Sequence, residues 1–155
     1  MHVGVNLGFG NLHEDMADDL MVESELRLAE LADRLGYDSV WAVEHHFDDY
    51  SMCPANTLLL AHVAARTEHV KLGTGAVILP WNDPLRVAEK MIMLDIVSRG
   101  RAIFGMGRGL ARMEYEPLRI DMNESRGRFD EASAMIVEAL ETGWISGDGP
   151  FSLVP

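Results

Sequence analysis

Three titratable residues, Glu44, His45 and His46, directly follow a short apolar run at residues 39–43. Titratable groups beside a buried strand cost free energy unless they are paired. Histidine titrates near neutral pH, and a neighbouring carboxylate fixes its tautomer and raises its basicity. One hypothesis is therefore a general base, or a hydrogen-bonding pair for an anionic intermediate. The alternative is that one histidine packs at the rim of the fold while the other is solvated.

A metal site is a second interpretation of the same histidines. Adjacent residues of a strand point to opposite faces, so His45 and His46 are poorly placed to bind one metal ion. His62 and His69 lie on the expected following helix and at its end, and no further cluster of histidine or cysteine supplies the missing ligands. We therefore expect no metal site.

Two glycine-containing segments are further candidates for ligand contact. Residues 73–76 read Gly-Thr-Gly-Ala, and glycines inside a strand indicate either close approach to a ligand or a bulge. Residues 103–109 place Gly107 and Arg108 at the end of another strand, without the spacing of a dinucleotide fingerprint. There Arg108 could bind a phosphate in a bidentate manner, or it could be a solvated residue after a tight turn.

Short apolar segments alternate with longer helical ones along the chain. Strands are predicted at residues 3–9, 39–43, 70–79 and 101–106, and helices at residues 23–35, 54–66, 83–97 and 124–141. Gly36, Gly100 and Gly143 are predicted to follow helix ends, and Asp83 with Pro84 to start a helix. This βαβαβαβα order predicts an α/β fold with a parallel sheet, either an open doubly wound sheet or a (βα) barrel.

The composition limits the class of protein. A chain of 155 residues with 48% hydrophobic and 25% charged residues predicts one globular domain over residues 1–155. The formal charge of -12 argues against nucleic acid or an anionic membrane as a main partner. Cys53 is the single cysteine, and neither a leader peptide nor a membrane-spanning run is visible, so a cytoplasmic protein is expected.

Several of these segments resemble the bacterial luciferase and luciferase-like monooxygenase family. The run Glu44-His45-His46-Phe47 matches the family's Glu-His-His-Phe sequence. The resemblance extends in order over nearly the whole chain, at residues 3–7, 35–41, 73–80, 83–86, 94–101 and 104–110. The family forms a (βα)8 TIM barrel, which needs about 250 residues. The resemblance therefore implies about four βα units, half of such a barrel, ending before the fifth strand.

The resemblance also implies a site for reduced flavin mononucleotide (FMN) at the carboxyl ends of the strands. His45 would be the catalytic base, supported by Glu44 and His46. The backbone of Gly75 and Ala76 would lie against the isoalloxazine ring, through a non-prolyl cis peptide. The residues implied at the cofactor are Gly75, Ala76, Gly107 and Arg108, of which Arg108 would contact the phosphate.

By the same resemblance, the expected function is a monooxygenase that uses O2 on an aldehyde or similar small organic substrate. A separate flavin reductase would supply the reduced FMN. Gly107 stands where luciferase itself has a reactive cysteine, so light emission is not expected. The alternatives are a deazaflavin-dependent oxidoreductase of the same superfamily, or a catalytically silent flavin-binding or scaffold half-barrel. Exposed sheet edges and the apolar residues 57–61 predict a homodimer or higher oligomer.

Overall fold

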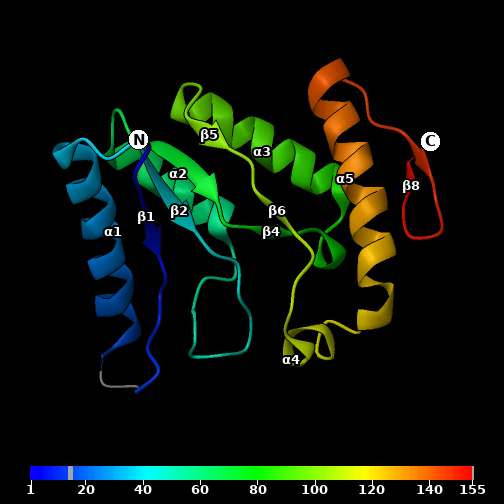
Figure 1. Cartoon of the computed structure of the whole chain (residues 1–155), viewed down its shortest axis with the longest axis horizontal. Helices are drawn as coiled ribbons and strands as arrows, with labels where there is room; N and C mark the ends of the chain where they lie inside the picture. The colour runs from blue at the N-terminus through cyan, green and yellow to red at the C-terminus, as the bar shows by residue number, and fades with distance from the viewer. Residues whose placement is uncertain (14–15, 155) are drawn as a thin grey trace. The chain divides into compact units, whose positions relative to one another are not determined.

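The structure, a computed structural model, describes residues 1–13 and 16–154 (Figure 1). The chain divides into two compact units. The first unit comprises Met1–Val77 and Leu94–Gly105, and the second comprises Ile78–Met93 and Met106–Pro155. Each unit buries apolar side chains of its own, for example Leu7 and Leu72 in the first and Ile136 in the second. The single domain expected from the composition stays a prediction.

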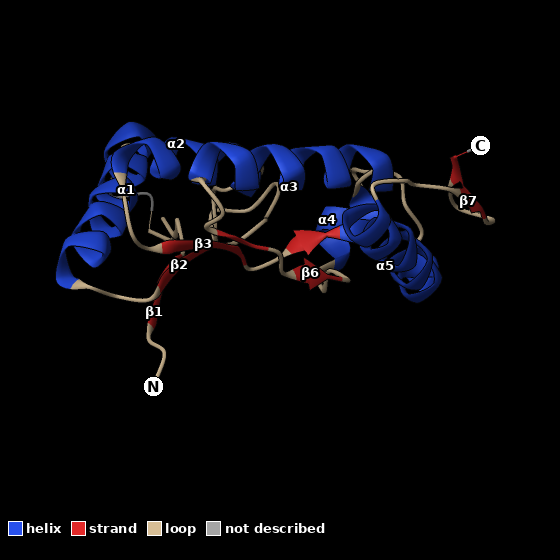
Figure 2. Cartoon of the chain, turned by 90° about the horizontal axis from the view of Figure 1, so that it is seen from above, coloured by secondary structure: helices blue, strands red, loops and turns tan. Residues whose placement is uncertain are grey.

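The first unit contains a parallel sheet whose strands follow one another in sequence order. These strands are β1 (Gly4–Leu7), β2 (Ser39–Ala42), β3 (Lys71–Thr74) and β5 (Ala102–Ile103). A doubly wound sheet reverses its strand order at a switch point, and this sheet contains no such reversal over its four strands. The helices α1 (Asp18–Leu35) and α2 (Asn56–Arg66) cover the same face of the sheet (Figure 2). This arrangement favours the barrel alternative.

The predicted helix ends are confirmed. Gly36 follows α1 with φ 77°, and its N–H donates to carbonyl groups of the last turn. The helix α3 (Pro84–Ser98) starts as predicted, with the Asp83 carboxylate accepting a hydrogen bond of 3.0 Å from the Arg86 N–H. Gly143 follows α5 (Ser125–Thr142) with φ 80°. Only glycine adopts these left-handed conformations without steric cost.

All four strands are shorter than predicted, and the third and fourth break for a reason visible in their hydrogen bonds. The third breaks after Thr74 and resumes as β4 (Val77–Ile78), and the fourth breaks after β5 and resumes at Met106, which pairs with β4. The Thr74 hydroxyl accepts from the Gly105 N–H and donates to its carbonyl oxygen, both at 2.9 Å. A side chain therefore replaces the backbone ladder at this point, which a strand pattern in the sequence does not reveal.

The second unit is built around α5, which packs on the short 3-10 helix η1 (Leu79–Trp81). Its buried face consists of Ala132, Met135, Ile136 and Ala139. The remaining elements are β6 (Met106–Gly107), which pairs with β4, then α4 (Arg112–Tyr115), η2 (Met122–Glu124), and an antiparallel hairpin of β7 (Gly147–Asp148) and β8 (Leu153–Val154). The sequence patterns predicted neither α4 nor the hairpin.

The indole of Trp41 leaves no room for side chains at neighbouring positions of β1 and β3. Trp41 pairs in register with Gly73 on β3, and a Cβ at Gly73 would lie 2.4 Å from the indole ring. A Cβ at Gly4 on β1 would lie 3.0 Å from the indole nitrogen. The indole N–H donates to Ser39 Oγ at 2.9 Å. Gly73 is therefore required by packing within the protein.

The Arg101 guanidinium, just before β5, joins the end of α2 to the sheet. Its five N–H groups donate to four carbonyl oxygens and one hydroxyl at 2.8–3.0 Å, from Ser98, Thr67, Val70 and Ala64. The last carbonyl groups of a helix have no partners within the helix. Arg101 supplies such partners at the end of α2, so it stabilises the crossover between β2 and β3.

None of the helices in residues 1–13 and 16–154 is long and apolar enough to cross a membrane. The cytoplasmic location and the absence of a nucleic-acid partner stay predictions.

We predict that Arg101→Ala lowers the free energy of unfolding by about 2–3 kcal/mol, because carbonyl groups at the end of α2 lose charged donors. Urea denaturation followed by circular dichroism measures this loss. Arg86→Ala is the matched control, since Arg86 pairs with Glu89 on the exposed surface, and its effect should stay within about 0.5 kcal/mol. Equal losses in the two variants would contradict the role assigned to Arg101.

Candidate functional site

Glu44, His45 and His46 follow β2 after one intervening residue, at the carboxyl end of the sheet. The Glu44 side chain is 6% exposed, and its Oε1 lies 3.4 Å from His46 Nε2. The His45 ring lies edge-on to Tyr50, with ring centroids 5.3 Å apart and an interplanar angle of 87°. Both histidines are partly buried, so the alternative of a fully solvated histidine does not hold. The structure thus brings the three residues together and pairs the buried carboxylate with His46.

Gly8 and Phe9, which follow β1, are hydrogen-bonded to the residues that follow Tyr50. The Ser51 hydroxyl donates to the Gly8 carbonyl oxygen at 2.7 Å, and the Met52 N–H donates to the Phe9 carbonyl oxygen at 3.0 Å. The Phe9 N–H donates in turn to Glu25 on α1 at 3.2 Å. Burial raises the pKa of Glu25 above its usual value, and hydrogen bonds from the backbone of Phe9 and Gly8 act in the opposite direction. Sequence reasoning missed Glu25, because a charged residue on an exposed helix pattern gives no signal of this contact.

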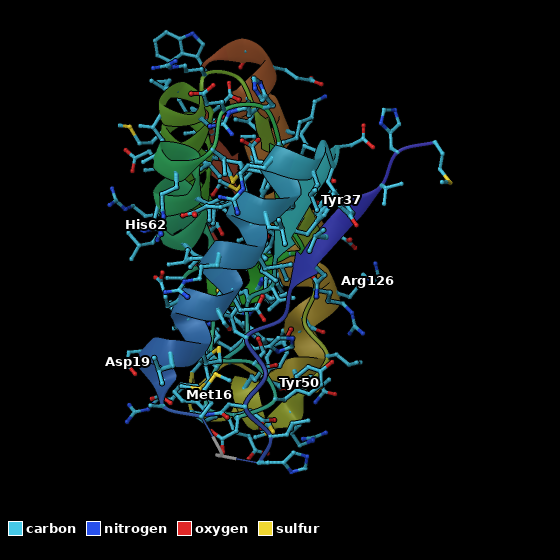
Figure 3. The ribbon with its side chains drawn as sticks, turned by 90° about the vertical axis from the view of Figure 1, so that its left-hand side faces the viewer. Met16, Asp19, Tyr37, Tyr50, His62 and Arg126 are labelled. Atoms are coloured by element: carbon cyan, nitrogen blue, oxygen red, sulfur yellow. The ribbon has the colours of Figure 1, made fainter. Side chains whose placement is uncertain are left out.

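A hollow of about 560 Å³ lies beside the two histidines. It is lined by His45, His46, Phe47, Asp48, Asp49, Ser51, Met52 and Pro54. Tyr50 lies at the same end of the first unit as Met16 and Asp19, near the start of α1 (Figure 3). This end is where the strands of a parallel βα protein place their chemistry. The position of the hollow therefore agrees with the site predicted from Glu44, His45 and His46.

An apolar cavity of about 470 Å³ adjoins this segment and is lined by residues of α1 and α2, including Leu26 and Leu59. Met52 and Pro54 line both the cavity and the hollow beside the histidines. Cys53 also lines the cavity, and burial raises the pKa of its thiol to about 11. The thiol therefore keeps its proton at neutral pH and is a poor nucleophile.

The backbone at Gly75 and Ala76 is held by two hydrogen bonds to buried residues, Ala42 and Asn56. The peptide bond between them is cis, as the family resemblance implied. The Gly75 N–H donates to the Ala42 carbonyl oxygen at 2.8 Å. The side-chain amide of Asn56, which is 3% exposed, donates to the Ala76 carbonyl oxygen at 3.1 Å. Sequence reasoning missed Asn56, although a lone amide at the start of an otherwise apolar helix was an available signal.

The three glycines around Thr74 have different reasons for lacking a side chain. A Cβ at Gly73 would overlap Trp41, and a Cβ at Gly105 would lie 2.1 Å from the Thr74 carbonyl oxygen. A Cβ at Gly75, by contrast, would come no closer than 3.6 Å to Trp41, which is ordinary van der Waals contact. The sequence left open whether these glycines serve a ligand or the local structure of the strand. At Gly73 the side chain is missing because of packing against Trp41. Gly75 leaves space at the carboxyl end of β3, which is consistent with the approach of a ligand.

Gly107 and Arg108 belong to the second unit. Gly107 ends β6, and Arg108 follows it. The Nη1 of Arg108 donates to the Ser125 hydroxyl at 2.9 Å, and Arg108 is partly buried. The alternative of a solvated arginine after a tight turn is therefore wrong. Sequence reasoning missed Ser125, because the contact joins residues from different elements.

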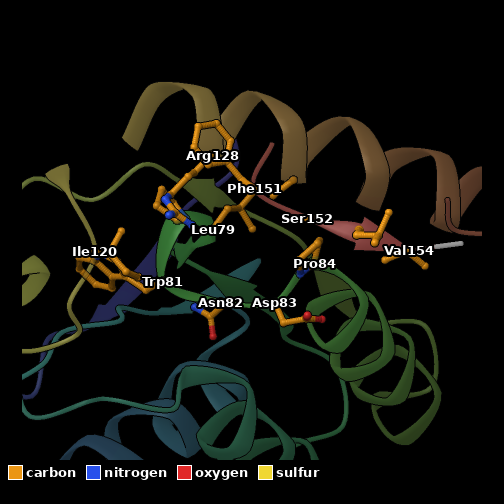
Figure 4. Close-up of a pocket in the computed structure, with 13 residues that line it drawn as sticks. Leu79, Trp81, Asn82, Asp83, Pro84, Ile120, Arg128, Phe151, Ser152 and Val154 are labelled. Atoms are coloured by element: carbon orange, nitrogen blue, oxygen red, sulfur yellow. The ribbon is translucent and has the colours of Figure 1, made fainter. Parts of the chain in front are cut away.

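A separate cavity of about 310 Å³ in the second unit contains none of the predicted site residues (Figure 4). Trp81, Arg128 and Phe151 are among the residues that line it. The Arg128 guanidinium lies over the Phe151 ring, 4.8 Å from its centroid, and pairs with Glu124 at 2.8 Å. These contacts hold the C-terminal hairpin against α5.

The other histidines considered as metal ligands make different contacts. His62 Nε2 lies 3.3 Å from Arg66 Nη1, and the His69 ring, 81% exposed, lies 3.9 Å from Glu68. Within the described ranges, no group of three or more His, Cys, Asp or Glu residues is arranged to hold a metal ion.

The luciferase-like monooxygenase family matches residues 1–155 of the chain. The alkanal monooxygenase alpha chain of Aliivibrio fischeri is 35% identical over 122 residues, which cover 79% of this chain and 34% of that relative. The oxygenase component of the flavin-dependent trigonelline monooxygenase of Acinetobacter baylyi is 36% identical over 110 residues, covering 68% of this chain and 31% of that relative. The chain thus spans about a third of the length of these relatives.

Solved structures confirm the fold. The monooxygenase RslO1 from Streptomyces bottropensis superposes with a TM-score of 0.93 at 39% identity, covering 99% of this chain and 47% of that one. An F420-dependent secondary alcohol dehydrogenase superposes with a TM-score of 0.80 at 18% identity, covering 99% of this chain and 46% of that one. The predicted half of a luciferase-like TIM barrel is therefore confirmed.

The two glycines beside Trp41 give a prediction about stability. Gly73→Ala should lower the free energy of unfolding by about 1–3 kcal/mol, because the added methyl group overlaps the indole. Gly75→Ala should cost less, since its methyl group meets only ordinary contacts. Chemical denaturation of the two variants beside the unchanged protein measures the difference. A larger loss for Gly75→Ala would show that its missing side chain also serves packing.

Proposed function

Because the chain belongs to the luciferase-like monooxygenase family, we propose that it binds reduced FMN and uses O2 to oxidise an aldehyde or a similar small organic substrate. The observation that carries this proposal is the adjacency of two features at the carboxyl ends of β2 and β3. The Glu44-His45-His46 segment follows β2, and the open backbone at Gly75 is hydrogen-bonded to the last residue of that strand. The chain spans about half of the solved relative's length, so its own activity is part of the proposal.

The residues present fit a flavin ring. Gly75 offers a backbone without a side chain, and Trp41 fills the sheet face below it. The buried Asn56 amide fixes the adjoining carbonyl group. A flat ring can therefore approach this backbone without displacing a side chain of β3. When bound, the reduced flavin would supply the electrons that activate O2.

In this proposal, His45 moves a proton at one of its ring nitrogens during oxidation of the substrate. The edge-on contact with Tyr50 and the backbone hydrogen bond from the His45 N–H to Cys53 hold the ring in one orientation. Glu44 and His46 flank His45 in the sequence and support it. The buried Glu44 carboxylate is paired with His46. In the second unit, Arg108 binds the flavin phosphate, and the neighbouring Gly107 also contacts the cofactor.

A deazaflavin cofactor is the second candidate. The F420-dependent dehydrogenase shares the fold, and Arg108 does not discriminate between phosphorylated cofactors. For FMN, we propose a separate flavin reductase as the source of reduced cofactor. The trigonelline relative is named an oxygenase component, which supports a second, separate protein that reduces the flavin.

The enzymatic proposal is tested with His45→Ala. This variant should lose at least about 100-fold in aldehyde oxidation, because a positioned general base contributes that much or more. Anaerobic titration should show reduced FMN still binding, and His69→Ala should keep full activity, since its side chain is 81% exposed. Oxidation assayed with a flavin reductase and analysed by mass spectrometry measures the rate. Equal rates in the two variants would remove His45 from the chemistry, and no binding at millimolar flavin would favour the silent half-barrel.

We also propose a homodimer or higher oligomer, because several apolar side chains lie on the helix surfaces. On α3, Ile96 is 65% exposed and Met93 is 59% exposed, and on α2 Leu58 is 72% exposed. Leu60, from the apolar segment 57–61, is instead fully buried in the first unit, so only part of that segment is available to a partner.

Ile96→Glu should shift the protein to monomers at micromolar concentration, because a buried unpaired carboxylate opposes association. Light scattering coupled to size-exclusion chromatography measures the mass. Leu20→Glu on α1 is the control, with a leucine that is 62% exposed. A compact monomer that unfolds cooperatively in the unchanged protein would contradict the oligomer.

A further inference from the structure

Arg108 is held at both its backbone and its side chain by buried residues of α4 and α5. Tyr115 of α4 is 1% exposed, and its hydroxyl donates to the Arg108 carbonyl oxygen. Ser125, the first residue of α5, is 2% exposed, and its hydroxyl accepts from Arg108 Nη1 at 2.9 Å. Two separate elements of the second unit therefore determine where the guanidinium lies.

The Tyr115 ring is itself fixed by its neighbours. It lies edge-on to Trp81, with ring centroids 5.3 Å apart and an interplanar angle of 76°. Gly109 has φ 79°, and a Cβ there would lie 2.9 Å from Trp81 and 3.1 Å from the Tyr115 hydroxyl. The backbone after Arg108 therefore packs directly on this pair of rings. Burial raises the pKa of Tyr115 above its usual value, so the phenol keeps the proton that it donates.

The hydrogen bond to Ser125 leaves the guanidinium able to bind an anion. Arginine has five N–H donors in a planar fork, and the bond to Ser125 uses one of them. The remaining donors suffice for two parallel hydrogen bonds to phosphate oxygens. Such a bidentate geometry is directional, so its strength depends on how well the fork is oriented before the phosphate arrives.

We propose that Ser125 and Tyr115 are positioning residues that orient Arg108 toward a phosphate monoester, and thereby set the preference of this chain for FMN over unphosphorylated flavin. The inference rests on the proposed function, in which Arg108 binds the flavin phosphate. Ser125 holds the fork through its hydroxyl, and Tyr115 holds the backbone from which the side chain extends. Neither residue needs to touch the phosphate.

The test compares the affinities for reduced FMN and reduced riboflavin, measured anaerobically by fluorescence titration. Riboflavin lacks the phosphate, so the ratio of the two affinities isolates the contribution of Arg108. Arg108→Ala should abolish the preference, while Ser125→Ala and Tyr115→Phe should each reduce it by about threefold to tenfold, the value of one hydrogen bond. Riboflavin binding itself should stay unchanged in all three variants.

Two control variants separate positioning from general damage to α5. Ser125→Thr keeps the hydroxyl and should keep the preference. Ser133→Ala removes a hydroxyl from the same helix, one that donates to the Asp130 carbonyl oxygen, and should change neither affinity. In the Arg108→Ala background, Ser125→Ala should have no further effect on the ratio, because residues that act through one another are not additive.

The outcomes distinguish the two levels of the proposal. If Arg108→Ala abolishes the preference for FMN but Ser125→Ala and Tyr115→Phe keep it, the positioning roles are overturned and the phosphate role of Arg108 stands. If the unchanged protein shows no preference, or Arg108→Ala retains it, the phosphate role fails and the positioning roles fail with it. A Ser125→Ala variant that loses riboflavin binding equally would show a structural role only.

Discussion

The placement of the Trp41 indole on the sheet determines which residues the neighbouring strands can carry. The ring lies over Gly73, its partner in register on β3, where a methyl group would overlap it, and at Gly4 on β1 a methyl group would overlap Ser39 Oγ and lie 3.0 Å from the indole nitrogen. One large side chain therefore fills the space that three strands would otherwise share. The next residues along β2 and β3, Ala42 and Thr74, bring the chain to the carboxyl end of the sheet. The packing constraint from Trp41 ends there, because a Cβ at Gly75 would meet the indole only at an ordinary van der Waals distance.

The candidate site is built on backbone groups whose hydrogen bonds come from buried side chains. Asn56 fixes the carbonyl group of Ala76, and the Thr74 hydroxyl replaces the sheet ladder at Gly105. Buried amides and hydroxyls must be hydrogen-bonded, so each of them has one favourable position. These polar contacts give the end of the sheet a defined shape where the regular strand pairing has stopped. A flat ligand would meet a surface already formed, which limits the entropy lost on binding.

The alternation of strands and helices was predictable because it depends on local signals. Glycines after helix ends and the Asp83 cap act on their own turns, and the structure confirms them. The breaks in the third and fourth strands were not predictable, since the contact between Thr74 and Gly105 joins residues far apart in sequence. The same holds for the partner of Glu44. The sequence placed the carboxylate beside both histidines, and only the folded chain shows its hydrogen bond to His46.

In the proposed role of Arg108 as a phosphate ligand, the strong acidity of the chain makes the orientation of its guanidinium more important than its charge alone. With a formal charge of -12, the mean field of the protein opposes a phosphate dianion. That field is screened over about 8 Å at physiological ionic strength, so only groups close to the phosphate decide whether it binds. A mobile arginine would spend much of its time near the abundant carboxylates. Arg108 is instead bonded to the neutral hydroxyl of Ser125 and partly buried, which keeps its charge available. In so acidic a protein, a neutral partner serves an anion site better than a carboxylate would.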